Sequence, residues 1–518
     1  MNNNIKAAAI TFNKPLLLLL FSSSSIWLLL LVAAAFKVHP SSAFLPPPSS
    51  TYSHHHIFMS SSTTTTTTSL ASYNIRPPII QWGIIGLGDV CTIKSGPAFY
   101  KSHGSRLVAV MRRTPGVARQ WVAENREVIQ KYNDDENNSS IESGGGGGQG
   151  VEIRGYDNIH QMITENIQQL DAIYVATPPG VHLENVRQIV SALDDATKTS
   201  FKTVNDGDEA EKKQQRLKAI YVEKPCGRTA WETRAMIDEL HHRNLQFFPA
   251  YVSRAHERTQ VLRKLLATKR IGDQVTKVQY TQRGSSFARG LDGVEGIPWR
   301  LSAEHSGGGL IMDMGCHVLD RIDYLFGPIQ NVKSEVLRKG GGGGVRDEDG
   351  RNYPLVEDYV SMKGTIGQCD WAVISSEEAI VECLWDFSPP DEDEKKNHGQ
   401  EKNDEDELLI TGTNGSLRMA GMGAGLPIEV LDVDGNVIET IEFEAPMHAA
   451  QPLIQSIVNE LRGVDVDDEH QQNDLVKSPA RAENAVRTSE VLDAILNSYY
   501  GGRHDEFWTR SESWPGLK

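Results

Sequence analysis

The sequence predicts an α/β protein in which a doubly wound parallel sheet is followed by an α+β domain with an open, mostly antiparallel sheet. In the first part of the chain, short apolar runs alternate with helix-like segments, as in parallel strands joined by helical crossovers. After about residue 254, strand-like runs follow one another without regular intervening helices, which is typical of antiparallel pairing. A chain of 518 residues is long enough for two such cores.

The first 75 residues are expected to be a removable targeting presequence. Residues 15–35 are largely apolar and lie between Lys14 and Lys37, as in a secretory signal, although a segment of this length is also long enough to anchor in a membrane. Residues 41–76 are rich in Ser, Thr and Pro and contain no acid, which matches a transit peptide. Because the junction at 41–46 resembles the cleavage site of two-part plastid presequences, we expect a plastid location, with an endomembrane or secreted location as the alternative.

Composition argues against several other classes of protein. The formal net charge is −16 and the first acid is Asp89, so the body of the chain is acidic and has no electrostatic footprint for nucleic acid. The five cysteines are odd in number, widely spaced and form no C-x-x-C, so neither a disulfide framework nor a zinc site is indicated. We therefore expect no metal, no nucleic acid and, after removal of the presequence, no membrane association.

The chain is organised around a glycine turn that follows the apolar strand expected at 79–85. Gly86 can adopt the backbone angles of a tight turn, and Gly88 leaves room for a pyrophosphate to approach the main chain. The next helix would then direct free N–H groups and its positive dipole end at that anion. The third small position of this G-x-G-x-x-G-like turn is Cys91, which departs from the pattern. Taken alone, the turn fits an ordinary strand–turn–helix equally well.

A second buried strand at 106–111 bears on the choice of nucleotide. In NAD-binding sheets an acid near this strand end holds the ribose 2′-hydroxyl, whereas an arginine accommodates a 2′-phosphate. This chain has Arg112 and Arg113 here and no acid. The sequence therefore favours NADP(H) over NAD(H), unless both arginines are merely solvated.

Three further strands complete the first sheet, with helices expected at 117–130 and 230–243. The runs at 171–180 and 219–225 are strands that end in a sharp break, and 245–251 is one more strand. Ligands of doubly wound sheets bind beyond the carboxyl ends of the strands. The residues expected there to contact the cofactor are Gly86, Leu87, Gly88, Asp89, Val90, Arg112, Arg113, Thr177, Pro178, His182, Glu223 and Lys224.

The second domain begins with a helix near 256–268 and contains most of the remaining strands. The strand-like runs lie at 275–283, 330–338, 356–366, 370–387 and 407–420, and helices near 450–461 and 480–498 close the domain. Within this domain the glycine run 307–309 precedes Asp313 and His317. Because Asp313 and His317 are four residues apart, a helix would place them on one face within hydrogen-bonding range.

Together these motifs resemble the glucose–fructose oxidoreductase/inositol dehydrogenase/rhizopine-catabolism (Gfo/Idh/MocA) family of NAD(P)-dependent oxidoreductases, from about residue 79 to the carboxyl end. The motifs that carry the resemblance are Gly83, Gly86 and Gly88; Ala176-Thr177-Pro178 with His182; Glu223-Lys224-Pro225; Gly307-Gly308-Gly309 with Asp313, His317 and Asp320; and Ile410, Gly412-Thr413 and Gly415. The resemblance implies a Rossmann domain, a second domain whose sheet often forms the subunit contact of a homo-oligomer, and a sugar, polyol or related substrate.

Domain boundaries follow from these motifs and from the polar segments between them. We expect a presequence at 1–75, a Rossmann domain at 76–253 and a substrate and oligomerisation domain at 254–518. Glycine-rich or charged composition predicts insertions at 131–150, 194–218, 339–352 and 389–406.

Three residues are expected to carry the chemistry. His317 has the ordinary pKa of a proton shuttle near neutral pH, and Asp313 would fix its tautomer. Lys224 would donate to the substrate oxygen and stabilise negative charge that develops there. The resemblance carries the same roles onto these residues.

For several other side chains the sequence allows either a role in the site or a structural role. Arg254, Trp299 and Arg300 either line the substrate pocket or serve packing and surface charge, and Asp320 is taken as structural. Cys226 and Cys316 adjoin the lysine and histidine motifs, so a thiol switch between them is a hypothesis beside inert packing.

Three functions compete. The first is a dehydrogenase or reductase acting on a sugar, polyol or dihydrodiol-like substrate with NADP(H) or NAD(H). The second is a glycosidase that uses bound NAD as a transient oxidant, as in one branch of the family. The third is a non-catalytic regulator like the galactose-regulon repressor, against which the joint presence of Lys224, Asp313 and His317 argues.

Overall fold

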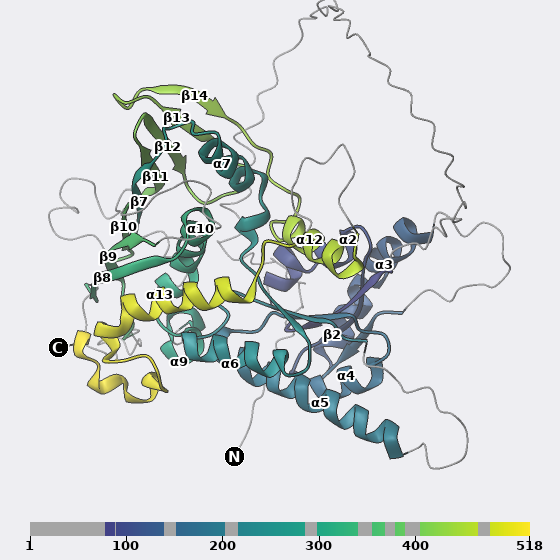
Figure 1. Ribbon diagram of the computed structural model, residues 1–518. Helices are drawn as coiled ribbons and strands as arrows, with labels where there is room; N and C mark the ends of the chain where they lie inside the picture. Colours follow the sequence, from purple (N-terminus) through teal and green to yellow (C-terminus); the bar gives the residue numbers. More distant parts are fainter. Residues whose placement is uncertain are drawn as a thin grey trace, which may run out of the picture. The chain divides into compact units, whose positions relative to one another are not determined.

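In the computed structural model, the described residues are 78–88, 90–138, 152–202, 216–284, 298–339, 355–367, 379–388, 405–464 and 477–517. The presequence, Asp89 and the central parts of the four expected insertions lie outside the described residues. Residues 75–518 form one unit, whose helices and strands are labelled in Figure 1.

The first sheet is the expected doubly wound parallel sheet. Its six strands have the order β3-β2-β1-β4-β5-β6, and every neighbouring pair is parallel. The order changes direction between β1 and β4, which is where ligands of such sheets bind. The strands are β1 Ile80–Ile85, β2 Ser105–Met111, β3 Arg154–Tyr156, β4 Ala172–Val175, β5 Ala219–Val222 and β6 Gln246–Pro249.

Apolar side chains on both faces explain why these runs form buried parallel strands. Along β4, Ile173 and Val175 join one apolar cluster, whereas Tyr174 between them joins the other. Successive side chains of a strand point to opposite faces, so a continuous apolar run fills two cores at once. On the Tyr174 side the ring packs 5.1 Å from Tyr221, measured between centroids.

The helices of the first domain differ from expectation after the glycine turn, at the ends of α3 and α5, and at α4, which was not expected. The segment after the glycine turn is a six-residue π-helix, η1 Val90–Ser95, followed by the short α2 Ala98–Lys101. Gly96 and Pro97 separate them, because proline lacks the N–H that a continuous helix needs. Helices α3 and α5 extend to Asn138 and Lys202, into segments expected to be insertions. The helices that flank this sheet are α3 Val117–Asn138, α4 Ile159–Asn166, α5 His182–Lys202 and α6 Ala230–His241.

The second sheet is mostly antiparallel, as expected. Its eight strands have the order β14-β13-β12-β11-β7-β10-β9-β8, and only β7 and β10 pair in parallel. The run expected at 407–420 is a hairpin, since Gly412 pairs with Gly415 across a two-residue turn. Two short strands, β13 and β14, were not expected. The strands are β7 Val275–Arg283, β8 Ile329–Leu337, β9 Tyr359–Ile366, β10 Ile380–Asp386, β11 Glu405–Gly412, β12 Gly415–Ala420, β13 Ile428–Leu431 and β14 Val437–Ile441.

Two late helices join the domains. Helix α12 Gln451–Arg462 returns to the first sheet, where Leu453 and Ile457 share a core with Trp82 of β1. Figure 1 shows α12 beside α2, far from it in sequence. Helix α13 Ala482–Tyr500 contacts α6, α10 Cys316–Phe326 and β8. The chain therefore crosses back after the second sheet, and α7 Glu257–Ala267 begins the second domain.

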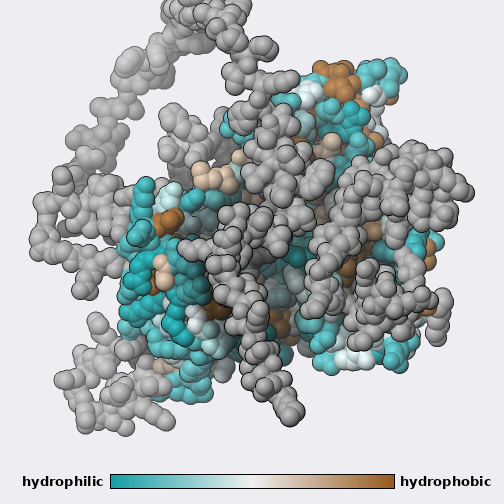
Figure 2. Space-filling model, turned by 180° about the vertical axis from the view of Figure 1, so that it is seen from behind, coloured by the Kyte–Doolittle hydropathy of each residue, from teal (hydrophilic) through white to brown (hydrophobic). Residues whose placement is uncertain are grey.

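The described surface is largely hydrophilic on the side seen in Figure 2, with separate hydrophobic patches between the hydrophilic areas. None of the helices among the described residues combines the length and apolar composition that crossing a membrane requires.

Candidate active site

The glycine turn lies at the carboxyl end of β1 and has the geometry expected for it. Gly86 has φ +100°, and a Cβ atom there would lie 2.9 Å from the carbonyl oxygen of Ala176 at the end of β4. A Cβ atom on the exposed Gly88 would meet no atom within 4 Å, so the main chain is open on that side. This opening fits the approach of a dinucleotide pyrophosphate. Asp89 and the side chain of Val90, both expected cofactor contacts, lie outside the described parts.

Arg112 reaches the glycine turn from the end of β2. Its guanidinium donates a hydrogen bond to the carbonyl of Leu87, although Arg112, like Arg113, is exposed. The arginine expected at the ribose is thus attached to the turn expected at the pyrophosphate. These two parts of a dinucleotide site lie together in the structure.

Both ring nitrogens of His182, an expected cofactor contact, are engaged by backbone carbonyls. Its ring is fully buried, with Nδ1 2.8 Å from the carbonyl oxygen of Cys226 and Nε2 2.6 Å from that of Thr177. Burial lowers the pKa of His182, and these two carbonyls partly oppose that effect. The ring therefore joins the turns after β4 and β5, and Thr177 Oγ1 donates at 2.8 Å to Asn185 Oδ1.

Lys224 and Asp313 bring the two domains together. The ammonium of Lys224, just after β5, pairs with the Asp313 carboxylate and donates to the Asp313 carbonyl oxygen at 3.1 Å. Arg300 Nε lies 3.3 Å from the other carboxylate oxygen, and its guanidinium stacks 4.5 Å from the ring of Trp299. Arg300 therefore contacts the Lys224–Asp313 pair, and Trp299 packs against its guanidinium.

His317 lies close to this pair without bonding to Asp313, which corrects the expected Asp313–His317 hydrogen bond. Within the described parts of the chain, no hydrogen bond joins these two side chains. Asp313 lies in η5 Ile311–Gly315, a π-helix, and His317 lies in the α-helix that follows. A π-turn is wider than an α-turn, so residues four apart are no longer stacked on one face.

The charges in this cluster set the protonation of all three residues. Burial disfavours the Lys224 ammonium, but the adjacent Asp313 carboxylate outweighs this and raises the pKa of Lys224. Burial is likewise outweighed at Asp313, where Lys224, Arg300 and His317 hold the pKa well below its ordinary value. Burial and the Lys224 charge lower the pKa of His317 well below 6.5, against the pull of Asp313. The site thus pairs a protonated lysine with a neutral histidine.

Glu223 lies beneath Lys224 rather than open to solvent. Its carboxylate accepts hydrogen bonds from the Tyr174 hydroxyl and from the Lys224 backbone N–H, the latter at 3.1 Å. Burial raises the pKa of Glu223, while Lys224 and Tyr174 oppose the rise. These bonds orient the turn that carries Lys224.

Arg254 is not a substrate-lining residue, and the structural alternative is correct for it. Its buried guanidinium makes a bidentate ion pair with Asp320, at 2.8–3.0 Å, and also reaches Asp323 at 3.2 Å. This pair fixes the start of the second domain against α10. Asp320 is therefore structural, as expected.

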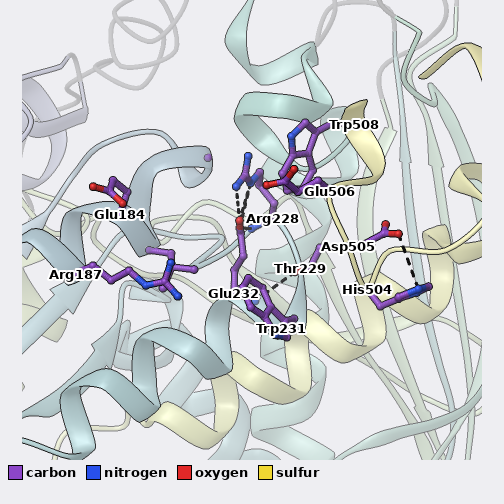
Figure 3. Close-up of a pocket in the computed structure, with 12 residues that line it drawn as sticks. Glu184, Arg187, Arg228, Thr229, Trp231, Glu232, His504, Asp505, Glu506 and Trp508 are labelled. Atoms are coloured by element: carbon purple, nitrogen blue, oxygen red, sulfur yellow. Dashed lines mark hydrogen bonds and ion pairs between the residues drawn. The ribbon is translucent and has the colours of Figure 1, made fainter. Parts of the chain in front are cut away.

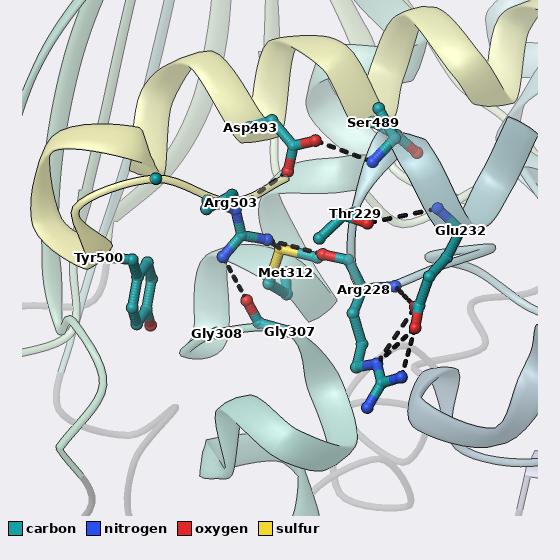
Figure 4. Close-up of polar contacts among 12 residues, drawn as sticks. Arg228, Thr229, Glu232, Gly307, Gly308, Met312, Ser489, Asp493, Tyr500 and Arg503 are labelled. Atoms are coloured by element: carbon teal, nitrogen blue, oxygen red, sulfur yellow. Dashed lines mark hydrogen bonds and ion pairs between the residues drawn. The ribbon is translucent and has the colours of Figure 1, made fainter. Parts of the chain in front are cut away.

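Arg503 was missed by the sequence reasoning, although it bonds both the glycine run 307–309 and the turn after Lys224 (Figure 4). Its guanidinium donates to the carbonyls of Gly307, at 2.5 Å, and Arg228, at 2.7 Å, and pairs with Asp493 of α13 at 3.0 Å. Gly307 has φ +90°, and a Cβ atom there would lie 2.7 Å from the Arg228 carbonyl oxygen. The glycine run thus packs directly against the turn after Lys224, a contact between parts too distant in sequence for any local pattern to reveal.

The neighbouring cysteines favour inert packing over a thiol switch. Cys226 and Cys316 are fully buried free thiols. Burial raises the pKa of Cys316 to about 12 and that of Cys226 well above its ordinary value. Because the thiolate is the reactive form, both thiols are poorly suited to oxidation.

A pocket of about 380 Å³ lies beside the Arg228 turn (Figure 3). Arg228 stacks 3.6 Å from the Trp508 ring there, and Trp231 is exposed. Neither Lys224 nor His317 lines this pocket, so it is separate from the reactive cluster. Among the described residues, no group of three or more His, Cys, Asp or Glu side chains is placed to hold a metal ion.

Known proteins resemble this chain in sequence and in fold. Residues 259–418 match the family model of the GFO/IDH/MocA C-terminal domain. Oxidoreductase P35 of Formosa agariphila is 24% identical over 422 residues, covering 81% of this chain and 99% of that protein. The solved super-repressor mutant of Gal80p from Saccharomyces cerevisiae has 14% identity and a TM-score of 0.57, over 81% of this chain and 95% of that one. The WlbA dehydrogenase from Bordetella pertussis, solved with NADH and UDP-GlcNAcA, has 17% identity and a TM-score of 0.51, over 81% and 96%.

A doubly wound sheet with a glycine turn, an open mostly antiparallel second sheet and this match define a two-domain oxidoreductase. The domain model that matches residues 259–418 is that of the Gfo/Idh/MocA family, which the sequence motifs also resemble.

Proposed function

We propose that the protein is a dehydrogenase or reductase that transfers hydride between NADP(H) and a hydroxyl or carbonyl carbon of a sugar, polyol or dihydrodiol-like substrate. The observation that carries this proposal is the meeting of Lys224, from the end of the first sheet, with Asp313 and the neighbouring His317 of the second domain. The opening at Gly88, with Arg112 bonded to the same turn, supports dinucleotide binding there. The WlbA dehydrogenase, whose solved complex holds NADH and UDP-GlcNAcA, supports the substrate class.

The protonation states suit proton transfer at the substrate oxygen. A bound nicotinamide supplies or accepts the hydride. During oxidation, the neutral His317 accepts the hydroxyl proton, and during reduction the imidazolium returns a proton to the carbonyl oxygen. The Lys224 ammonium donates a hydrogen bond to that oxygen and stabilises negative charge on it. Asp313 positions Lys224 through their ion pair.

The activity should depend on pH through His317. Because burial and Lys224 lower its pKa, the free enzyme keeps a neutral imidazole below pH 6.5. We expect kcat/KM for oxidation to stay constant down to pH 6.5 and to fall only at lower pH, as the imidazole gains its proton. The unfolded chain protonates this histidine at higher pH than the folded chain, so stability should also decrease as pH falls through 6.5. An acid limb centred above pH 6.5 would contradict the assignment of His317 as base.

The preference for NADP(H) should depend on Arg112. Replacing Arg112 with Met removes a charged donor that would bond the 2′-phosphate, and such bonds contribute about 1.5–3 kcal/mol. We expect the Kd for NADPH to rise about tenfold or more, while the Kd for NADH changes little. Fluorescence titration of both nucleotides measures this, with Arg126→Met on the exposed face of α3 as the matched control. Equal losses for the two nucleotides would indicate that Arg112 only supports the turn.

A direct screen tests the proposed function. Sugars, polyols, sugar acids and aldehydes are offered to the purified protein with NADPH or NADP⁺, and nicotinamide absorbance is followed. Stoichiometric change with one substrate class supports hydride transfer. The likeness to Gal80p favours a second candidate, a non-catalytic regulator, for which ligands bind without any absorbance change. Release of free sugar without net absorbance change would instead indicate a glycosidase.

For assembly, we propose a homo-oligomer that forms through the outer face of the second sheet. Paired charges cover part of this face, with Glu382 of β10 bonded to Lys277 at 2.8 Å and to Lys363 at 2.6 Å. Light scattering of the protein and of a Glu382→Lys variant, which places three positive charges together, tests this. An unchanged mass for the variant argues against this face.

For location, we propose import into a complex plastid through the presequence at 1–75. A fluorescent fusion of about the first 80 residues, compared with a fusion in which residues 41–46 are replaced, tests the proposal. Retention in the endomembrane system or secretion of the intact fusion would contradict it.

A further inference from the structure

A buried group of basic side chains lies next to the reactive histidine. Arg321 follows His317 by four residues in α10, so the two lie on one face of this helix, one turn apart. Arg321 is only 2% exposed, and Arg258 at the start of α7 is only 1% exposed. His256, also buried, lies close enough to both arginines for their charges to lower its pKa, although burial is the larger cause. The charges of Arg321 and His256 also act on His317.

Arg321 has few acceptors for its buried charge. Its Nη1 lies 3.2 Å from the sulfur of Met422, which is a weak acceptor. Its Nε has no hydrogen-bond partner among the residues that the structure describes. A buried guanidinium normally pairs with a carboxylate or bonds several oxygens, because an unpaired buried charge is costly. Among the described residues, the hydrogen-bonding contact of Arg321 is thus a single weak acceptor, and its buried Nε has none.

The two other basic groups are also incompletely bonded. Arg258 donates to the carbonyls of Gly421 and Gly423, both at 2.8 Å, and Pro427, at 2.7 Å, but its Nε lacks a partner in the described parts. His256 Nε2 lies 2.8 Å from the Ala449 carbonyl oxygen, whereas its Nδ1 is buried and unpartnered there.

Negative charge near this group is scarce within the described residues. Asp406 acts on both arginines, but it accepts a hydrogen bond from the Tyr280 hydroxyl at 2.8 Å, and burial raises its pKa. Asp320 also acts on Arg321, but its carboxylate is engaged by Arg254. Of the carboxylates that act on these two guanidinium groups, Asp406 is bonded to Tyr280 and Asp320 to Arg254, so the buried positive charge has room for a further anion.

We infer that Arg321, with Arg258 and His256, forms an anion-binding wall of the substrate pocket, so that the substrate is a hydroxy or carbonyl compound that also bears an oxyanion. The inference rests on the proposed function, because it places this anion beside the atom on which His317 acts. One helical turn separates the two contacts by about 6 Å along the axis, which is comparable with the width of one sugar ring. The planar fork of a guanidinium matches a carboxylate, as in a sugar acid, and also a phosphate ester.

Matched pairs of ligands test the inference by direct binding. The cofactor-loaded protein is titrated calorimetrically with glucuronate against glucose, gluconate against sorbitol, and glucose 6-phosphate against glucose. We expect at least one anionic member to bind about tenfold or more tightly than its neutral partner. If the carboxylates show the larger gain in affinity, the substrate is assigned as a sugar acid. If the phosphate shows the larger gain, the substrate is assigned as a sugar phosphate. No preference for the anion in any pair overturns the inference.

Two variants of Arg321 test whether this residue causes the preference for anionic ligands. Arg321→Met should remove it while leaving NADPH affinity unchanged, and Arg321→Lys, which keeps the charge without the fork, should retain only part of it. Arg270→Met, at an exposed ion pair with Glu439, makes the same change at the surface and should leave the preference intact. A preference that survives in a folded Arg321→Met protein contradicts the inference. If that variant does not fold, the Arg321→Lys protein and the wild-type pairs decide the outcome.

The results separate this inference from the proposed function. Binding that favours anions, without nicotinamide absorbance change for any substrate, rejects hydride transfer and keeps the anion site. Turnover of neutral substrates without any preference for anions keeps hydride transfer and rejects the anion site.

Discussion

Replacing His317 with Asn is expected to lower turnover severely while cofactor affinity stays nearly unchanged. Asparagine keeps polarity and approximate size but cannot accept the substrate proton near neutral pH. General acid–base groups contribute about 10²–10⁴-fold to rate, so kcat should fall by that factor. Stopped-flow absorbance of the nicotinamide measures the hydride step, and fluorescence titration measures the cofactor Kd.

The matched control is His242→Asn, at the exposed carboxyl end of α6. This variant should keep wild-type kcat, because His242 is exposed to solvent and, within the described parts of the chain, makes no hydrogen bond or ion pair with Lys224, Asp313 or His317. A His317→Asn enzyme that turns over at the wild-type rate would refute the assignment of the proton shuttle.

Replacing Lys224 with Met is expected to lower kcat by about 10²–10³-fold, the range found when one preorganised donor to a developing oxyanion is removed. Methionine keeps most of the side-chain length but lacks the ammonium. Asp313 then loses its principal partner and keeps Arg300, at 3.3 Å. Because the carboxylate is largely buried, the pKa of Asp313 should rise once the ammonium is gone.

Lys218→Met tests whether this loss is specific to the reactive cluster. Lys218 immediately precedes β5, at the end of the strand opposite to Lys224, and lies 3.9 Å from Asp171. The same substitution there should leave kcat within about twofold, as for surface changes away from special features. If the two variants lose activity equally, β5 needs its lysines for stability and Lys224 has no direct part in the reaction.

The changed partnership of Asp313 alters how the site should be tested. The sequence spacing placed Asp313 beneath His317, whereas the structure pairs its carboxylate with Lys224 and Arg300. Asp313 is therefore a positioning residue for the lysine. Substitution of Asp313 should perturb the donor at the substrate oxygen more than the tautomer of His317.

Most of the fold could be predicted because it rests on local patterns. Buried parallel strands need apolar residues on both faces, and this requirement is visible in the runs that became β1, β2, β4 and β5. The short strands β3, β13 and β14 escaped prediction because strand formation depends on neighbouring strands more than on the residues themselves. The extension of α5 to Lys202 escaped prediction because its charged and polar composition resembled an insertion.

The sequence by itself determined the two-sheet architecture, the glycine turn and the residues that meet at the site, because each depends on short-range periodicity or on a motif of fixed spacing. Only the tertiary structure decided which partners these residues take. It pairs Asp313 with Lys224, buries Arg254 against Asp320, turns His182 inward and leaves Arg321 with unused donors beside His317. Such pairings join residues up to about ninety positions apart, and burial, rather than sequence spacing, sets the free energy of each one.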